Sequence, residues 1–153
     1  MHTRTLTVIL AAGLFTLSSA FTGLHAQESR HRINAKGVGQ DLGGGNTVAD
    51  ILGGGLLQGT TAAAFGFVGF CDATSVAFAG DVVFTTLHGT LTVTVSGCFD
   101  LSTGEFFASG PVTDATGKLA GATGFLSFVG VEDLSTGEFT NTIDGEIVVD
   151  LSK

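Results

Sequence analysis

Few residues of this chain have the type and spacing that chemistry requires. His88 is the one histidine of the segment rich in β-forming residues, and a Ser-His-Asp triad would need a serine within its reach. The chain contains no Gly-x-Ser-x-Gly sequence, which presents such a serine in many hydrolases. The pair His88-Gly89 is instead typical of a hairpin turn, so we expect a structural role for His88.

The carboxylates give further candidates for acid–base chemistry. Asp81 has apolar neighbours on both sides, and burial there would raise its pKa. However, if the even-numbered residues of 76–84 face inward, the alternation of a strand places Asp81 outside. Glu105 and Glu138 each follow a glycine, and we expect them to be solvated residues at the ends of hairpins.

A heptapeptide, Asp-Leu-Ser-Thr-Gly-Glu-Phe, occurs twice, at 100–106 and 133–139. Its Asp can accept backbone hydrogen bonds and its Gly can adopt positive φ, which predicts two tight hairpin turns. Asp100, Ser102 and Glu105 are reminiscent of a calcium loop, but an EF-hand needs more oxygen ligands and a distant Glu. We therefore expect capped turns, and neither a metal site nor a cofactor.

Cys71 and Cys98 are the two cysteines of the chain. In an exported protein they can form a disulfide, which would contribute about 3–4 kcal/mol by constraining the unfolded state. The alternative is a pair of buried free thiols. A Cys-x-x-Cys sequence and a metal-type spacing of histidines are both missing, which argues against redox catalysis and zinc.

The beginning of the chain has the features of a secretory signal peptide. His2 and Arg4 precede an apolar run at 6–17, and small residues follow. We expect cleavage after Ala26, with Ala20 as the alternative, and hence a secreted or periplasmic protein. A retained membrane anchor is less well supported, because the run is short for a span of roughly 20 residues.

The chain is acidic, with a formal net charge of −8. Such a surface repels phosphate backbones and anionic membranes, which argues against nucleic acid as a partner. The acidic residues are accounted for by solubility. The chain has neither Trp nor Tyr, so it lacks the aromatic girdles of outer-membrane barrels, and we expect no integral membrane association.

The sequence predicts a domain organisation of three parts: a signal peptide at 1–26, a flexible Gly-rich lead-in at 27–59, and an all-β domain at 60–153. The lead-in contains two Gly triplets, although 51–58 could add an edge strand. The all-β domain has six expected strands, at 60–71, 75–87, 89–99, 105–113, 122–132 and 138–151. Glycines within these strands favour coiling and closure, so we expect a small antiparallel β-barrel of six to eight strands rather than a sandwich.

Phenylalanine is the only aromatic residue of the chain and occurs thirteen times. Six of these residues are candidates for the lining of an apolar lumen: Phe65, Phe67, Phe78, Phe84, Phe125 and Phe128. They would either pack into a filled core or leave room for one apolar molecule.

The segment 113–128 reads Thr-Asp-Ala-Thr-Gly-Lys-Leu-Ala-Gly-Ala-Thr-Gly-Phe-Leu-Ser-Phe. It resembles a turn-and-strand element of the allene oxide cyclase and dirigent barrel superfamily, in particular its bacterial secreted members. Thr116, Gly117, Ala122 and Gly124 match the motif. The resemblance implies a small β-barrel with an apolar lumen, often assembled as a trimer, and the matching positions are structural rather than catalytic.

These observations leave three functions open. The first is a secreted barrel that binds a small apolar ligand in its lumen. The second is a cyclase- or isomerase-like enzyme of the allene oxide cyclase type, which would need a polar residue inside the lumen. The third is a surface or matrix interaction protein that uses the Thr-rich exterior. The sequence does not decide whether the protein is an enzyme, because no polar lumen residue is evident from the pattern.

Overall fold

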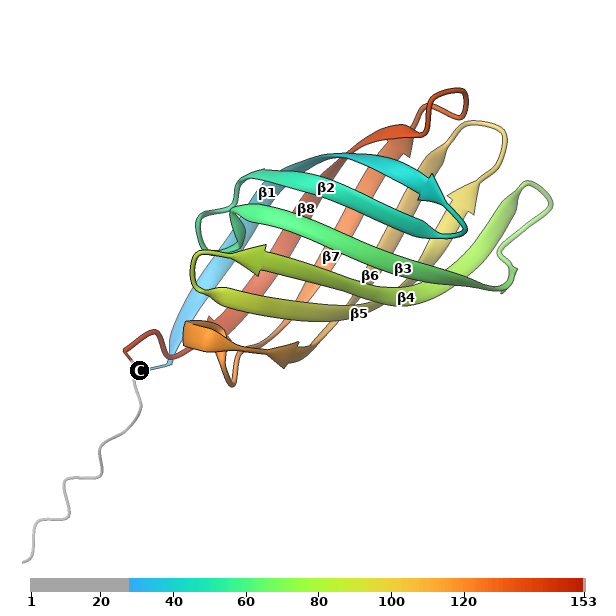
Figure 1. Cartoon of the computed structure of the whole chain (residues 1–153). Coiled ribbons are helices and arrows are strands. Elements are labelled where there is room, and N and C mark those ends of the chain that lie inside the picture. The colour runs from blue at the N-terminus through green and yellow to red at the C-terminus, as the bar shows by residue number, and fades with distance from the viewer. Residues whose placement is uncertain (1–27, 153) are drawn as a thin grey trace, which may run out of the picture.

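The computed structural model describes residues 28–152, so the predicted signal peptide lies outside the described residues. The described chain forms a closed antiparallel barrel in which each strand pairs with the next and β8 pairs with β1 (Figure 1). The all-β barrel predicted from the sequence is therefore confirmed. Its strands are β1 Ser29–Gly43, β2 Asn46–Gly53, β3 Gly59–Phe70, β4 Ser75–Thr86, β5 Gly89–Asp100, β6 Glu105–Ala115, β7 Thr123–Glu132 and β8 Glu138–Val149.

The segment that we expected to be a flexible lead-in supplies two strands of the barrel. β1 pairs with β8 along its length, from Ser29–Val149 to Gln40–Glu138. The triplet 43–45 forms the turn between β1 and β2, with φ of 81°, 66° and 80°. The prediction for 29–53 was wrong because ladder hydrogen bonds to β8 and β3 compensate for the low strand propensity of its glycines. Residues 51–58 divide between β2 and a short 3-10 helix, η1 Gly55–Leu57.

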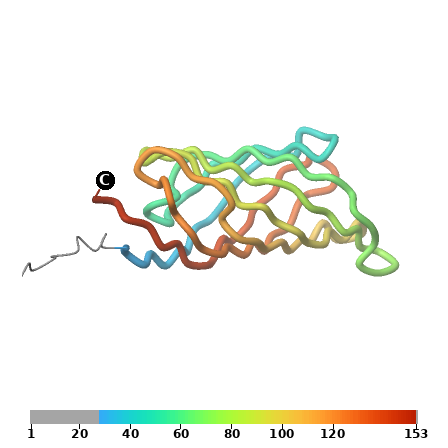
Figure 2. Tube along the Cα trace, turned by 90° about the horizontal axis from the view of Figure 1, so that it is seen from below, coloured from blue at the N-terminus to red at the C-terminus, as the bar shows by residue number. Residues whose placement is uncertain are grey.

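The two ends of the barrel are built differently. At one end η1 and a second 3-10 helix, η2 Gly117–Leu119, bring Leu57 and Leu119 into the interior, and both are 0% exposed. The end of the described chain lies at this end as well (Figures 1 and 2). The opposite end carries the turns β1–β2, β3–β4, β5–β6 and β7–β8. The apolar core fills the end closed by the 3-10 helices, and it includes Phe84, Leu91, Leu126 and Ile147.

The two copies of the heptapeptide form equivalent turns at the open end, as predicted. Oδ1 of Asp100 accepts hydrogen bonds from the backbone N–H groups of Ser102 (2.7 Å) and Thr103 (3.0 Å), and Oδ1 of Asp133 accepts one from Ser135 (2.8 Å). The Ser102 hydroxyl is the main cause that lowers the pKa of Asp100 to about 2. Both turns are therefore closed by carboxylates that stay ionised at neutral pH.

The glycines of these turns give a testable difference. Gly104 and Gly137 have φ of 75° and 74°. We expect Gly104→Ala to lower the free energy of unfolding by about 1 kcal/mol or more, because a Cβ is strained at positive φ. The cost should be smaller for Gly137→Ala. A Cβ at 104 would strike the carbonyl oxygen of Glu132, whereas at 137 the nearest atom is Nε2 of the flexible Gln40, at 2.9 Å.

Urea unfolding of the two variants measures this difference. Equal costs, or no cost in either variant, would contradict the assignment. Calcium serves as the control, and it should not raise the melting temperature of the wild type, because we assign these turns no metal.

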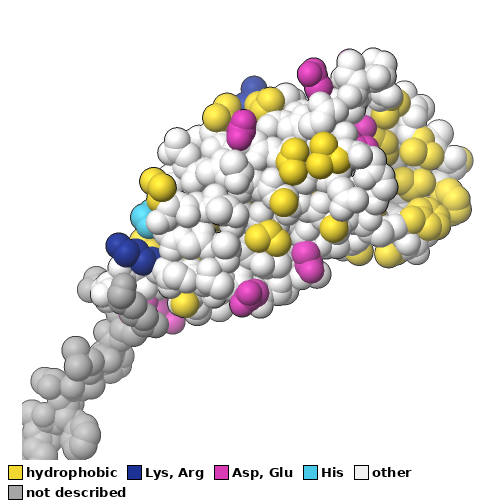
Figure 3. Space-filling view, viewed as in Figure 1, with side chains coloured by type: hydrophobic (Ala, Val, Ile, Leu, Met, Phe, Trp, Pro, Cys, Tyr) yellow, Lys and Arg dark blue, Asp and Glu magenta, His cyan; other side chains and the backbone are white. Residues whose placement is uncertain are grey.

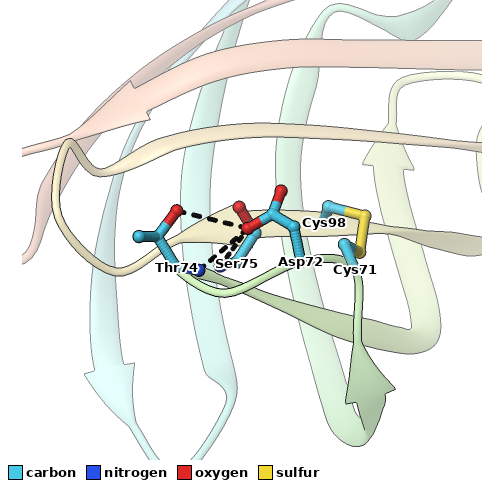
Figure 4. Close-up of a disulfide and its surroundings, with 5 residues drawn as sticks. All are labelled: Cys71, Asp72, Thr74, Ser75 and Cys98. Atoms are coloured by element: carbon cyan, nitrogen blue, oxygen red, sulfur yellow. Dashed lines mark hydrogen bonds between the residues drawn. A yellow bond between two sulfur atoms is a disulfide. The ribbon is translucent and has the colours of Figure 1, made fainter.

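Cys71 and Cys98 form a disulfide, as predicted, with their Cα atoms 6.2 Å apart (Figure 4). The bond ties the residue after β3 to the last part of β5. Next to it, Oδ1 of Asp72 accepts hydrogen bonds from the N–H groups of Thr74 (2.9 Å) and Ser75 (2.8 Å). The β3–β4 turn is thus held at both of its ends.

Candidate functional site

The open half of the barrel contains a cavity of about 530 Å³. This volume lies within the range of roughly 300–1,000 Å³ that is typical of small-molecule pockets. The strands β2 to β8 contribute inward residues to its wall. β1 contributes Asp41, which lies near the end of that strand. The barrel is therefore filled at one end and hollow at the other.

Four of the six predicted lumen residues line this cavity: Phe65, Phe67, Phe78 and Phe128. Phe67 is 64% exposed and lies toward the end of β3, so it belongs to the entrance. Phe84 faces inward as well, but it is 0% exposed and packs in the filled half.

Phe125 was placed wrongly, because its side chain is 53% exposed on the outside of the barrel. Its neighbour Leu126 faces inward and is 0% exposed. The two residues point to opposite faces because the side chains of a strand alternate.

Asn141 is a polar side chain that lies among the apolar residues of the cavity wall. It is opposite Gly37 on β1 and Gly130 on β7, neither of which has a side chain. A Cβ at position 37 would strike Oδ1 of Asn141, and one at position 130 would lie 2.7 Å from its Cβ. The two glycines thus clear the space that this amide occupies.

One atom of the Asn141 amide, Oδ1, is fully buried and has no hydrogen-bond partner in the described part of the chain. Leaving a buried polar group unpaired costs roughly 1–3 kcal/mol, and such groups are rare in native proteins. Oδ1 lies against Gly37 of β1, while the residue itself lines the cavity, so the rest of the amide is a candidate binding group.

Two carboxyl groups lie at the entrance of the cavity, on Asp41 at the end of β1 and on Glu132 at the end of β7. Burial raises the pKa of Glu132 above its usual value, and the nearby charge of Asp41 raises it further. Oδ1 of Asp41 accepts a hydrogen bond from the N–H of Gly43 (2.8 Å). The entrance is therefore acidic on one side.

The raised pKa of Glu132 has a consequence for stability. The folded state binds the Glu132 proton more tightly than the unfolded state does, so ionisation of this carboxyl destabilises the fold. Below the unfolded pKa both states are protonated and there is no penalty, and the penalty is complete above the folded pKa. We expect Glu132→Gln to raise the melting temperature by a few degrees at neutral pH, with the gain vanishing below about pH 4.

Thermal unfolding of wild type and variant from pH 3 to 8 (roughly the titration range of carboxyl groups) measures this difference. Glu138→Gln is the matched control, because Glu138 is an exposed residue of β8. A gain that is independent of pH would show that the charge of Glu132 is not its cause.

Large exposed hydrophobic side chains surround the entrance. One such side chain lies in or next to each of the four turns at the open end. These residues are Leu42, Phe70, Leu101 and Leu134. Figure 3 shows hydrophobic side chains concentrated at the end of the molecule from which the β3–β4 hairpin projects. The approach to the cavity is therefore apolar as well as acidic.

The other residues that we considered for chemistry lie away from the cavity. His88 is in the turn between β4 and β5 at the closed end, where its carbonyl oxygen accepts a hydrogen bond from the N–H of Lys118 (2.7 Å). Asp81 is on the exterior, as the alternation predicted, and accepts a hydrogen bond from Thr94 Oγ1 (2.6 Å). Glu105 and Glu138 are exposed, and within residues 28–152 no group of three or more His, Cys, Asp or Glu is arranged to hold a metal ion.

No protein-family model matches this chain. No curated protein and no solved structure matches it either. Among residues 28–152 there is no helix of sufficient length and apolar character to cross a membrane. The function must therefore be inferred from the residues of the cavity itself.

Sequence reasoning missed Asn141 and Glu132, although the signal was present. Phe139 and Ile143 are large apolar residues of the last expected strand, and if both face inward, strand alternation places Asn141 inward too. The same rule applied from Phe128 places Glu132 inward. Asp41 had no such signal, because β1 was not expected to be a strand.

The duplicated turn also distinguishes these residues. When the two heptapeptides are superimposed in sequence, the hairpin β5–β6 matches the hairpin β7–β8. Gly97 pairs with Ala108 in the first hairpin, and Gly130 pairs with Asn141 at the same distance from the turn in the second. Likewise Phe99 of the first hairpin corresponds to Glu132 of the second. The polar residues of the lumen are thus departures from an otherwise apolar pattern.

Proposed function

We propose that this protein binds one small apolar molecule in the open half of its barrel, without turnover. The observation that carries the proposal is the cavity of about 530 Å³, whose wall consists mainly of Phe, Ala, Val and Ile side chains. Burial of apolar ligand surface there contributes about 25 cal/mol per Å² before the costs of association. The wall of the cavity belongs to a closed barrel, and the disulfide Cys71–Cys98 links two of its strands near the entrance.

Native mass spectrometry tests the proposal. We expect the purified wild type to carry a small hydrophobic adduct that is lost on denaturation. Ala63→Phe should abolish the adduct, because Ala63 points into the cavity. Ala62→Phe is the matched control, since Ala62 is the preceding residue of β3 and is exposed. Adduct retained by Ala63→Phe and lost in the control would contradict the proposal.

A second candidate function is a cyclase- or isomerase-like activity in the same cavity. Glu132, with its raised pKa, and the amide of Asn141 are the polar groups that such an activity would use, Glu132 as acid or base and Asn141 as a hydrogen-bond partner. The resemblance to allene oxide cyclase barrels favours an unsaturated fatty epoxide as the test substrate. Cyclic product formed above the uncatalysed rate by wild type and not by Glu132→Gln supports the enzyme, and a rate equal to buffer contradicts it.

The setting that fits this function is outside the cytoplasm. The disulfide agrees with an oxidising compartment, and export would follow from the signal-like sequence at 1–26. N-terminal sequencing of exported protein should begin near Gln27, and a sequence beginning at Met1 would contradict export by cleavage. A trimer, as the family resemblance implies, would be seen by light scattering of the purified protein.

A further inference from the structure

The proposed function leaves open what kind of apolar molecule the cavity takes. The charges of the wall bear on this question, because a few polar groups fix orientation and specificity in an otherwise apolar pocket. The charged side chains that line the cavity are those of Asp41 and Glu132. No described Lys, Arg or His lines it, so the charge of the wall is negative.

The carboxyl of Glu132 is available to a ligand. It has no hydrogen-bond or salt-bridge partner within residues 28–152. Its oxygens keep accessible surface, because the fully buried unpaired side-chain atoms of the described chain belong to His31 and Asn141. The side chain is half-buried and lines the cavity, so a molecule in the entrance can reach its oxygens.

The carboxyl of Asp41 faces the same entrance. Burial is the main cause that raises the pKa of Glu132, and the charge of Asp41 raises it further, so the two carboxyls interact. Oδ1 of Asp41 accepts a hydrogen bond from the N–H of Gly43 (2.8 Å), whereas Oδ2 accepts none from a described residue. A positive charge placed between the two carboxyls would remove their repulsion.

A phenylalanine ring lies beside these carboxyls, on the side of the lumen. On β1 the inward residue before Asp41 is Gly39, and a Cβ at Gly39 would strike the ring of Phe139. Phe139 pairs with Gly39 on one side and with Glu132 on the other. The strand that carries this ring therefore lies between the two strands that carry the carboxyls.

A second ring extends this surface. On β7 the inward residue before Glu132 is Gly130, and a Cβ at Gly130 would strike the ring of Phe106. The rings of Phe106 and Phe139 are in edge-to-face contact, with centroids 6.0 Å apart, and both line the cavity. Aromatic rings attract ammonium groups. The rings and the carboxyls thus favour the same kind of ligand head.

The same wall argues against other head groups. A carboxylate such as that of a fatty acid would lose its hydration without gaining a cation, and Asp41 and Glu132 would repel it. A hydroxyl could donate a hydrogen bond to a carboxyl but would gain no attraction between charges. An ammonium group gains both, because it donates charge-assisted hydrogen bonds to carboxylates.

The position of the carboxyls fixes the orientation of such a molecule. They lie at the entrance, whereas the apolar wall continues inward to Ile143, which is 1% exposed. The charged head would therefore stay near solvent while the apolar chain leads into the lumen. The volume of about 530 Å³ holds on the order of 15 non-hydrogen atoms at roughly 30 Å³ each, the share of a water molecule in the liquid.

Resting on the proposed function, we propose that the ligand is a cationic amphiphile, whose ammonium group lies between the carboxyls of Asp41 and Glu132. Its single apolar chain fills the part of the lumen lined by Phe and aliphatic residues. The rings of Phe106 and Phe139 lie beneath the head. The cation compensates two negative charges that have no positive partner in the described chain.

Dye displacement with chain-matched probes tests this specificity. The protein has neither Trp nor Tyr, so an uncharged hydrophobic fluorescent dye serves as the reporter. The probes are dodecylammonium, dodecanol and dodecanoate at neutral pH, each below the concentration at which it aggregates. Dodecylammonium and dodecanol have the same number of non-hydrogen atoms and differ in charge. We expect the wild type to bind dodecylammonium about tenfold more tightly than dodecanol, and dodecanoate the least tightly.

Two double variants identify the carboxyls responsible. Asp41→Asn with Glu132→Gln should bring dodecylammonium and dodecanol to equal affinity, and the new amide at 41 keeps an oxygen for the N–H of Gly43. Glu105→Gln with Glu138→Gln is the matched control. It removes the same charge from exposed residues at the open end that do not line the cavity. This control should keep the preference for dodecylammonium.

The outcomes separate the two proposals. Dodecanol bound as tightly as dodecylammonium by the wild type would overturn the cationic specificity and leave the lumen-binding function standing. A preference that survives Asp41→Asn with Glu132→Gln, or that the control loses to the same extent, would overturn it as well. If Ala63→Phe binds the probes as well as the wild type does, or if no probe displaces the dye, the lumen-binding function itself fails.

Discussion

Phe84→Ala is expected to lower the free energy of unfolding by about 3–5 kcal/mol, while Phe78→Ala lowers it by only about 1–2 kcal/mol. The two residues face inward from the same strand, β4, but they lie in different halves of the barrel. Phe84 is 0% exposed, and its ring centroid is 6.2 Å from that of Phe128. Removing its ring leaves a void in the filled half.

Phe78 lines the cavity and touches Phe65 edge-on, with centroids 5.1 Å apart. Its removal enlarges a space that already exists, so little new void is created. Urea unfolding followed by circular dichroism measures both losses. Equal losses would mean that the open half is packed as tightly as the closed half, and the lumen-binding function would lose its basis.

Removal of the disulfide by the double substitution Cys71→Ser and Cys98→Ser is expected to cost about 3–4 kcal/mol. The bond closes a loop of 27 residues, which restricts the unfolded chain by about this amount. It also holds the β3–β4 hairpin, which contributes Phe67, Val76 and Phe78 to the cavity wall. The effect should therefore be local as well as global.

Hydrogen exchange of the double variant distinguishes the two effects. We expect faster exchange in the β3–β4 hairpin than in β7, which lies across the barrel from it. Chemical reduction of the wild type should reproduce the result without any substitution. Unchanged stability after reduction would contradict the expected contribution of the bond.

The sequence predicted the barrel because its second half alternates clearly. In Thr90–Ser96 and in the last strand, apolar and hydroxyl residues occupy opposite parities, and the structure keeps these faces apart. The turns were predictable for a similar reason, since Asp and Gly have specific backbone roles. β1 and β2 were missed because their glycines lower local propensity, and what holds them is pairing with β8, which lies far away in the sequence.

The candidate site was less predictable than the fold. Aromatic residues indicated an apolar interior. However, Phe125 could be excluded from the lumen only if it was known which alternate residues of its strand face inward. Whether the interior is filled or hollow depends on how the buried side chains of η1 and η2 pack into one end of the barrel. That packing is a tertiary property, and it sets the position of the cavity in the open half.

The duplicated hairpin allows the inward residues of one copy to be compared with those at the equivalent positions of the other. One copy retains Phe99 and Ala108, while the other presents Glu132 and Asn141 from an equivalent backbone. Variation at two positions of one copy can therefore alter selectivity while the shared turn preserves the architecture. The same logic provides a route to redesign, since Ala108→Asn would install a second amide on the neighbouring hairpin. A lumen assembled in this way can acquire a new preference one substitution at a time, without a new fold.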